Sequence, residues 1–170
     1  MGKSGLGVNT ATMRWGYRVA SQLIDMDRRI RPSHGRGVKL ILFRRDDRLL
    51  LVRHTYGRRH WTFPGGGVRT REEPDLAATR ELAEELAVTG VPLKSLGSHP
   101  VKDHLRTDVI SVFTGQCYSG TIVPRTVEIA EAHWFDEHDL PESVDPGVHT
   151  ALGLLAGSRA EYAASNNHAT

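Results

Sequence analysis

Three acidic side chains on one face of a short helix constrain this chain more than any other feature of its sequence. The glutamates Glu81, Glu84 and Glu85 stand at positions i, i+3 and i+4, in a segment predicted to be helical from about Pro74 to Leu86. This spacing places three carboxylates on the same helix face. Like charges so placed repel at roughly 0.2–0.5 kcal/mol for each close pair, and the C-terminal half of a helix disfavours anions. A solvated acidic face is the ordinary interpretation, so a functional one needs further evidence.

That evidence comes from the opposite helix face and from the preceding turn. Apolar side chains on the other face can pack on the protein and leave the carboxylates free: Leu76, Ala83 and Leu86. Three glycines, Gly65–Gly67, follow Pro64, which indicates a sharp turn or a close approach of the backbone. Exposed carbonyls in such a turn can add a further oxygen ligand. Because Mg²⁺ prefers oxygen ligands, turn and helix together favour a Mg²⁺ site.

The whole segment resembles the Nudix box, whose pattern is G-x5-E-x7-R-E-U-x-E-E-x-G-U with U apolar. The match begins at Gly66, reaches Glu72 after five residues and then Arg80-Glu81 after seven more, and it ends at Val88. One position departs from the pattern, because Ala87 stands where glycine is usual. The flanking segments 61–65 and 128–135 are also similar to those of this family, and the resemblance covers about residues 37–156.

The resemblance implies an α+β fold, an α/β/α sandwich around a mixed β-sheet. It implies hydrolysis of a phosphoanhydride bond in a nucleoside diphosphate linked to another group, by a metal-activated water, with Mg²⁺ or, as a substitute, Mn²⁺. Carried over by position, the metal-site residues are Glu81, Glu84, Glu85 and the Gly65 carbonyl, with Gly66 as a supporting residue or an alternative carbonyl. One of the three glutamates acts as general base in some family members. Glu72 and Arg80 form a supporting ion pair. Glu128 is the candidate for an extra ligand or base, with Glu131 as the weaker alternative.

Apolar patterning predicts the remaining elements and three segments of the chain. We expect strands at 38–43, 49–53, 97–103, 108–118 and 128–135, and a final helix at about 146–156. Residues 1–36 are predicted to be a basic helical arm, since they carry seven Lys or Arg and two Asp or Glu. Residues 37–156 form the hydrolase domain, and residues 157–170 are expected to be a flexible tail.

Composition limits the compartment and the partners. The single cysteine, Cys117, cannot form an internal disulfide, so we expect a cytoplasmic protein with Cys117 buried in a strand. No segment approaches the roughly 18–20 apolar residues of a membrane span. The expected partner is a small nucleoside diphosphate derivative, and a homodimer is a further expectation. Candidate phosphate contacts, each also interpretable as a surface cation, are Arg58, Arg59, His60 and Arg106.

Two other classes of function remain open at this level. A non-catalytic Nudix domain can act as a nucleotide-ligand sensor or a partner module, but such domains typically lose carboxylates that this box retains. Nucleic-acid binding through the basic arm has weak support, because the arm carries only +5. The histidines His54, His99 and His104 show no metal-ligand spacing, and structural roles are expected for them.

The single departure from the box allows a prediction about the backbone. Glycine after a helix often adopts a left-handed conformation, in which alanine costs about 1 kcal/mol or more. Gly90 and Pro92 follow closely. We therefore expect ordinary backbone angles at Ala87 and a chain reversal at 89–90.

Overall fold

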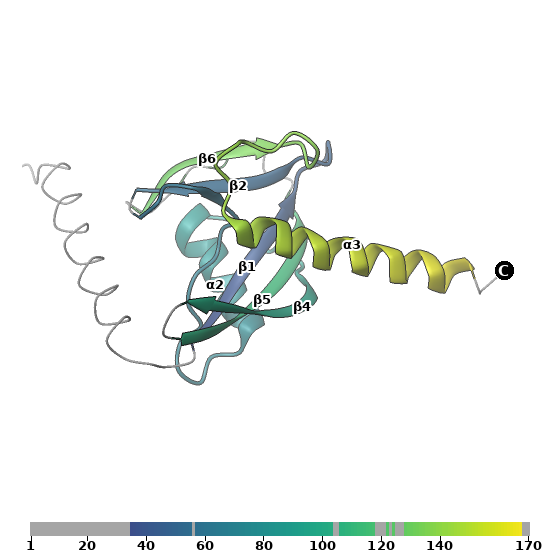
Figure 1. Ribbon diagram of the computed structural model, residues 1–170, viewed down its shortest axis with the longest axis horizontal. Coiled ribbons are helices and arrows are strands. Elements are labelled where there is room, and N and C mark those ends of the chain that lie inside the picture. The colour runs from purple at the N-terminus through teal and green to yellow at the C-terminus, as the bar shows by residue number, and fades with distance from the viewer. Residues whose placement is uncertain are drawn as a thin grey trace, which may run out of the picture. The chain divides into compact units, whose positions relative to one another are not determined.

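The protein folds into a mixed sheet with one helix packed on each face (Figure 1). The computed structural model describes residues 35–55, 57–103, 106–117, 122, 124 and 128–167. In chain order its elements are β1 (Arg36–Phe43), β2 (Leu49–His54), β3 (Trp61–Thr62), α2 (Pro74–Leu86), β4 (Lys94–Asp103), β5 (Arg106–Gln116), β6 (Ile129–Phe135) and α3 (Pro146–Asn167). The predicted α+β class is therefore confirmed.

Strand β1 lies in the middle of the six-stranded sheet formed by the described residues. The strand order is β3-β2-β1-β5-β4, and β6 pairs with β2. Strand β1 runs parallel to β5 over its full length but contacts β2 in antiparallel register only at Phe43 and Leu49. The remaining pairs, β2 with β3, β2 with β6 and β4 with β5, are antiparallel. Mixed pairing confirms the mixed sheet that the resemblance implies.

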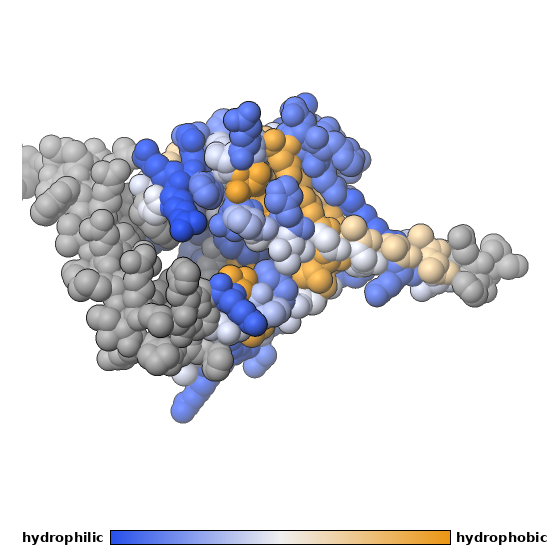
Figure 2. All heavy atoms as spheres, viewed as in Figure 1, coloured by the Kyte–Doolittle hydropathy of each residue, from blue (hydrophilic) through white to orange (hydrophobic). Residues whose placement is uncertain are grey.

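The alternation of side chains along β1 supplies both faces of the core. Val38, Leu40 and Leu42 belong to a buried cluster with Ala77, Ala78 and Leu82 of α2. Ile41 and Phe43 point to the other face and belong to a cluster with Val148, Ala151 and Leu155 of α3. Figure 1 shows α3 in front of the sheet and α2 behind it, and Figure 2 shows apolar residues on the face where α3 rests. The two helices and the sheet form the predicted sandwich.

Most predicted elements occur with small shifts at their ends. Helix α2 has the predicted bounds, and the 44–48 loop joins β1 to β2 as a hairpin, with Asp47 at φ 59°. Strand β4 begins three residues earlier than expected, at Lys94, and β5 runs from Arg106 to Gln116. Residues 1–34 of the predicted helical arm lie outside the described residues, and its last residue, Arg36, begins β1.

The predicted end of the last helix is wrong. Helix α3 continues to Asn167, so at least residues 157–167 are helical where a frayed tail was expected. The segment after Gly157 is rich in alanine and in residues with good helix propensity. Its small side chains are also exposed, so the segment lacks the apolar periodicity from which a helix is recognised in a sequence. Helix propensity contributes to the extension, and contacts of Ser158 with Lys94 and of Arg159 with Glu137 hold its beginning against the domain.

The structure also bears on two features noted from composition, the single cysteine and the lack of a long apolar segment. Cys117 is a free cysteine with 2% of its surface exposed, and its N–H donates to the Phe43 carbonyl at 2.8 Å. It is therefore buried as expected, although it lies one residue beyond the end of β5. Among the described residues, no helix has the length and the apolar character that crossing a membrane requires.

Candidate active site

The glycine turn that precedes α2 is held against the middle of β1. The N–H groups of Val38 and Leu40 donate to the carbonyls of Gly66 and Pro64 at 2.9 and 3.0 Å. Gly65 has φ 131°, and a Cβ added there would lie 2.2 Å from the Val38 carbonyl oxygen. Only glycine fits this position, because any side chain would collide with the backbone of β1. The glycine run thus permits the close approach that the sequence predicts.

Two of the three clustered glutamates face this turn. The Gly65 N–H donates to Oε2 of Glu85 at 3.0 Å. A Cβ added at Gly66 would lie 2.6 Å from Oε1 of Glu81, so the Glu81 carboxylate rests directly on the Gly66 backbone. Both carboxylates are buried, with 5% of Glu85 and 9% of Glu81 exposed. The structure therefore places Glu81 and Glu85 where the i, i+4 spacing predicts, and their role as ligands stays a prediction.

Arg80 connects the carboxylates of the box to the turn. Its Nε and Nη2 donate to Glu72 at 2.8 and 2.9 Å, and Nη2 also donates to the Gly67 carbonyl at 2.9 Å. Its Nη1 donates to Glu81 at 2.7 Å and to Glu84 at 3.0 Å. The Arg80 guanidinium lowers the pKa of the Glu72 carboxyl to about 2, and a hydrogen bond from the Arg69 N–H adds to this shift. The contact between Glu72 and Arg80 agrees with the supporting pair that the resemblance implies.

Glu84 differs from its two neighbours because it points toward cations instead of the turn. About half of its side chain is exposed, and its second partner is the Arg69 guanidinium at 3.1 Å. In the described part of the chain, no three acidic, histidine or cysteine side chains gather in a geometry that could hold a metal ion. The side-chain arrangement thus brings together Glu81 and Glu85 and directs Glu84 to Arg69 and Arg80.

The electrostatic environment of Glu85 is set first by burial. Burial raises the pKa of the Glu85 carboxyl to about 7, and the negative charges of Glu81 and Glu128 act in the same direction. The hydrogen bond from the Gly65 N–H and the ammonium of Lys39 oppose this shift. A buried carboxylate in such surroundings is stabilised by any additional cation.

Hydrogen bonding around the turn distinguishes one carbonyl from its neighbours. The carbonyls of Phe63, Pro64, Gly66 and Gly67 accept from Lys39, Leu40, Val38 and Arg80 respectively. Across these five turn residues, which the structure describes in full, only the Gly65 carbonyl has no donor. Gly65 is therefore the better candidate for a backbone ligand than Gly66, whose carbonyl is engaged by β1.

A divalent cation fits the chemistry of this donor set. Glu81 and Glu85 have buried carboxylate oxygens, and Gly65, whose N–H donates to Glu85, has a carbonyl oxygen without a donor among the residues that the structure describes. These are hard oxygen donors of the kind that Mg²⁺ prefers. Gly66 gives the Glu81 carboxylate space that a Cβ would fill. The glycine turn and the acidic helix face thus complement each other in shape and in charge.

The two acidic residues proposed outside the box have different surroundings. Glu131 lies on β6 and forms an ion pair with Arg53 of β2. Glu128 lies just before β6, where its carbonyl accepts from the Thr55 N–H at 2.8 Å, and its charge contributes to the raised pKa of Glu85. This electrostatic proximity favours Glu128 over Glu131 as the further acidic residue of the site.

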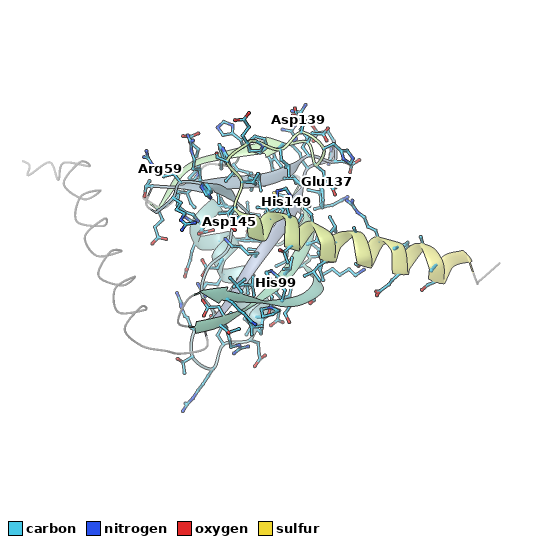
Figure 3. All side chains as sticks on the ribbon, viewed as in Figure 1. Arg59, His99, Glu137, Asp139, Asp145 and His149 are labelled. Atoms are coloured by element: carbon cyan, nitrogen blue, oxygen red, sulfur yellow. The ribbon has the colours of Figure 1, made fainter. Side chains whose placement is uncertain are left out.

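Among the described residues, the other cationic and histidine candidates make no hydrogen bond or ion pair with the glutamates of the box. Arg58 and Arg59 are exposed in the loop between β2 and β3, and Figure 3 labels Arg59 there, far from His99 on β4. Burial and the Lys39 ammonium lower the pKa of His54 to about 4, which favours a neutral, structural histidine. His104 and the side chain of Arg106 lie outside the described residues.

The prediction for Ala87 is wrong. Ala87 ends α2 in the left-handed region, with φ 57° and ψ 25°. The next residue, Val88, has 8% of its surface exposed and packs in the core cluster, and its N–H donates to the Leu82 carbonyl at 3.1 Å. Burial of Val88 and this hydrogen bond offset the strain at Ala87. The chain does bend at Gly90, whose φ is 71°, so both residues take positive φ.

Two residues near the site were missed by sequence reasoning. Lys39 lies in the middle of β1, and its Nζ donates to the Phe63 carbonyl at 2.8 Å. Asp145 precedes α3 (Figure 3), and its N–H donates to the carbonyl of Trp61 on β3 at 2.8 Å. The available signal for Lys39 was a single charge inside an apolar strand. Asp145 had only a helix-capping signal, a residue of the capping type followed by proline.

Comparison with known proteins agrees with this geometry. The NUDIX domain family model matches residues 33–153. The NAD-capped RNA hydrolase NudC of Escherichia coli O1:K1 / APEC is 32% identical over 127 residues, which are 72% of this chain and 49% of that protein. The chain therefore spans about half the length of the curated relatives it matches.

Solved structures of the same fold include bacterial proteins with different descriptions. A MutT NUDIX hydrolase from Burkholderia pseudomallei is 26% identical, with a TM-score of 0.63 over 72% of this chain and 98% of that chain. The NUDIX domain of Shewanella oneidensis NrtR, solved with ADP ribose, shares the fold at 18% identity, with a TM-score of 0.64 over 82% of this chain and 97% of that chain. The family model covers most of the sequence and includes the turn, the acidic helix and both faces of the sheet. This chain belongs to the Nudix hydrolase family.

Proposed function

We propose that this chain hydrolyses a phosphoanhydride bond in a nucleoside diphosphate linked to another group, with Mg²⁺ as its cofactor and Mn²⁺ as a substitute. The observation that carries the proposal is the contact between the acidic helix and the glycine turn. There the buried Glu85 carboxylate accepts from the Gly65 N–H, and Glu81 rests on Gly66. Burying two like charges side by side is unfavourable unless a cation compensates them.

The residues of the box have distinct proposed roles. Glu81, Glu85 and the Gly65 carbonyl hold the cation, and Glu84 joins them by leaving its exposed contacts with Arg69 and Arg80. Glu72 and Arg80 hold the helix in register with the turn. Glu128, whose charge acts on Glu85, is the proposed general base or additional ligand, and one of the three box glutamates remains the alternative base.

A divalent cation in this position supplies charge compensation for the diphosphate and lowers the pKa of a coordinated water. The protein's contribution is to orient the carboxylates before the substrate arrives. Glu85 is fixed by the Gly65 N–H and Glu81 by Arg80, so neither has to be ordered during the reaction. Such preorganisation is the usual source of catalytic advantage in phosphoryl chemistry.

The comparisons give an order in which to test substrates. The relatives that match over about half of their length are named NAD-capped RNA hydrolases, and one protein of the same fold was solved with ADP ribose. We therefore place NADH-like dinucleotides first. Nucleotide sugars, dinucleoside polyphosphates and oxidised nucleoside triphosphates follow.

The test is a product-release screen over these four groups with purified protein, with and without Mg²⁺. The phosphorylated products are separated by chromatography, because cleavage of such a linkage yields nucleotides, phosphate esters or pyrophosphate and no free phosphate. We expect release from at least one group. We also expect release to stop with excess chelator and to return with Mg²⁺ or Mn²⁺. Activity that persists in chelator would contradict the metal-dependent mechanism. If a compound binds tightly without turnover in any metal, the chain is instead a nucleotide sensor, and the hydrolase proposal fails.

A further inference from the structure

Lys39 is the one charged residue within the apolar part of β1, residues 38–43. Its neighbours along β1, Val38 and Leu40, are 1% and 0% exposed and pack toward α2. Lys39 points to the opposite face, where its side chain keeps partial contact with solvent. A lysine in such a position loses hydration and rotamer freedom, so its presence requires a compensating interaction.

Lys39 contacts the glycine turn directly and acts on the acidic residues through its charge. The Lys39 backbone lies against Gly65, because a Cβ added at Gly65 would lie 3.2 Å from the Lys39 Cα. The Lys39 Nζ donates to the Phe63 carbonyl at 2.8 Å, two residues before Gly65. Burial lowers the pKa of Lys39, and three negative charges, two on α2 and one just before α3, oppose this shift. In order of decreasing effect they are Glu85, Asp145 and Glu81. Two of these three are the carboxylates that face the glycine turn, so the lysine compensates the charge that a bound metal would also compensate.

We propose that the Lys39 ammonium is a built-in competitor of the divalent cation, so that it stabilises the site without metal and weakens metal binding. This inference rests on the proposed function, because it assumes that Glu81 and Glu85 hold the cation. Lys39 is here a positioning and charge-compensating residue that acts through the carboxylates, and no contact with substrate is assigned to it.

Two effects of opposite sign follow from removing Lys39, and the structure indicates which is larger. Loss of the bond to Phe63 would loosen the turn and weaken metal binding. The turn, however, stays fixed to β1 by the bonds of Val38 to Gly66 and of Leu40 to Pro64, and to Glu85 through Gly65. Loss of the positive charge removes its repulsion of a doubly charged ion, and Coulomb interactions extend over several ångströms in a protein. The charge effect should therefore dominate.

The experiment measures Mn²⁺ affinity by titration calorimetry for four variants beside the full-length wild type. Lys39→Met removes the charge and the hydrogen bond, Lys39→Gln removes the charge but keeps a donor, and Lys39→Arg keeps the charge. Lys94→Met is the matched control, because Lys94 lies on β4 with its Nζ near Ser158 of α3. We expect Lys39→Met and Lys39→Gln to bind Mn²⁺ about tenfold or more tightly. Lys39→Arg and Lys94→Met should bind as the wild type does.

A second measurement uses thermal unfolding with and without Mn²⁺. Without metal, Lys39→Met should melt at a lower temperature than the wild type, and Mn²⁺ should raise its melting temperature by more than it raises that of the wild type. Equal or weaker Mn²⁺ binding by both neutral variants would overturn the inference, even if the wild type hydrolyses its substrate. A wild type that neither binds Mn²⁺ nor hydrolyses any test compound would overturn the proposed function and this inference together.

Discussion

Helices α2 and α3 begin in different ways. Asp145 precedes α3, and its Oδ1 accepts from the Gly147 N–H at 2.8 Å, with Pro146 in the first turn. Such an arrangement satisfies the free N–H groups at a helix start. Glu73 precedes α2, and its side chain makes no capping hydrogen bond. The start of α2 therefore lacks the side-chain cap that α3 has, although Pro74 and Asp75 lie in its first turn.

The two helices differ again in what they bury. The buried residues that α3 contributes to the core are apolar, namely Val148, Ala151 and Leu155. Helix α2 buries Ala77, Ala78, Leu82 and Leu86 but also Glu81 and Glu85, and it ends at Ala87 with a left-handed backbone. Buried charges and a strained helix end, both unfavourable for stability, therefore occur on α2, beside the glycine turn. Such concentration is expected at a functional site, where stability is given up for geometry and charge.

The strongest test of this contrast is Glu85→Gln. We expect the folded variant to lose at least about a hundredfold in hydrolytic rate, because it loses a charge-stabilising or basic group. Its thermal stability should not fall, since a neutral amide removes a buried charge whose pKa burial has raised to about 7. Steady-state kinetics and thermal unfolding measure the two effects.

The matched control is Glu161→Gln, which changes an exposed glutamate of α3 in the same way. It should leave both rate and stability unchanged. Turnover near that of the wild type in a folded Glu85→Gln protein would refute the proposed role of α2.

The second test concerns the fit between turn and helix. Gly66→Ala would place a Cβ 2.6 Å from Oε1 of Glu81 and should displace that carboxylate. We expect a loss of about tenfold or more in rate, because displacements of about 1 Å near a reacting centre are costly. Gly67→Ala is the control, since nothing lies within 4 Å of its added Cβ. Equal activity of the two variants, measured at saturating Mg²⁺, would show that the contact is not needed.

The third test concerns the ion pair that supports α2. Glu72→Gln should lower the rate by less than about tenfold, by loosening helix orientation, and it should lower stability at neutral pH. The pKa of Glu72 is lowered from 4.5 to about 2. Its stabilising contribution is therefore present above pH 4.5 and is lost as pH falls toward 2. The stability difference between wild type and variant should shrink over that range.

Denaturant unfolding at several pH values measures this difference. Glu73→Gln, at the exposed neighbouring position, is the control and should show no such trend. A difference between wild type and Glu72→Gln that stays constant from pH 7 to pH 2 would contradict the assignment to the ion pair.

Sequence pattern predicted α2 and the placement of its glutamates because periodicity and the box are local. The i, i+4 spacing alone puts Glu81 and Glu85 on one face, and the glycine run beside them indicates a close approach. Which glutamates face the turn and which contact arginine could not be predicted in this way. It depends on the position of Arg80, which engages Glu81 and Glu84 while Glu85 faces the Gly65 N–H.

Contacts between distant segments account for the residues that were missed. The role of Lys39 depends on two interactions between distant segments. Its ammonium donates to Phe63, and α2 brings the charge of Glu85 close enough to act on it. The extended end of α3 was missed for another reason, since its exposed, alanine-rich surface carries no apolar period. Ala87 was predicted incorrectly because local strain was weighed without the burial of Val88 that offsets it.

The smallest expected effect comes from Ala87→Gly. A left-handed backbone costs an alanine roughly 1–2 kcal/mol relative to glycine, and the greater freedom of glycine in the unfolded chain removes about 0.4–1 kcal/mol of that gain. We therefore expect the free energy of unfolding to rise by about 0–1.6 kcal/mol. The rate should not change, because the carboxylates precede this position.

The same substitution in α3 should have the opposite sign. Ala156 lies in the helix interior and is exposed, so Ala156→Gly should lower the free energy of unfolding by about 1 kcal/mol. Denaturant titrations of the two variants beside the wild type measure both changes. If glycine destabilises both positions equally, Ala87 is not strained. The left-handed end of α2 would then not be a source of instability that distinguishes α2 from α3.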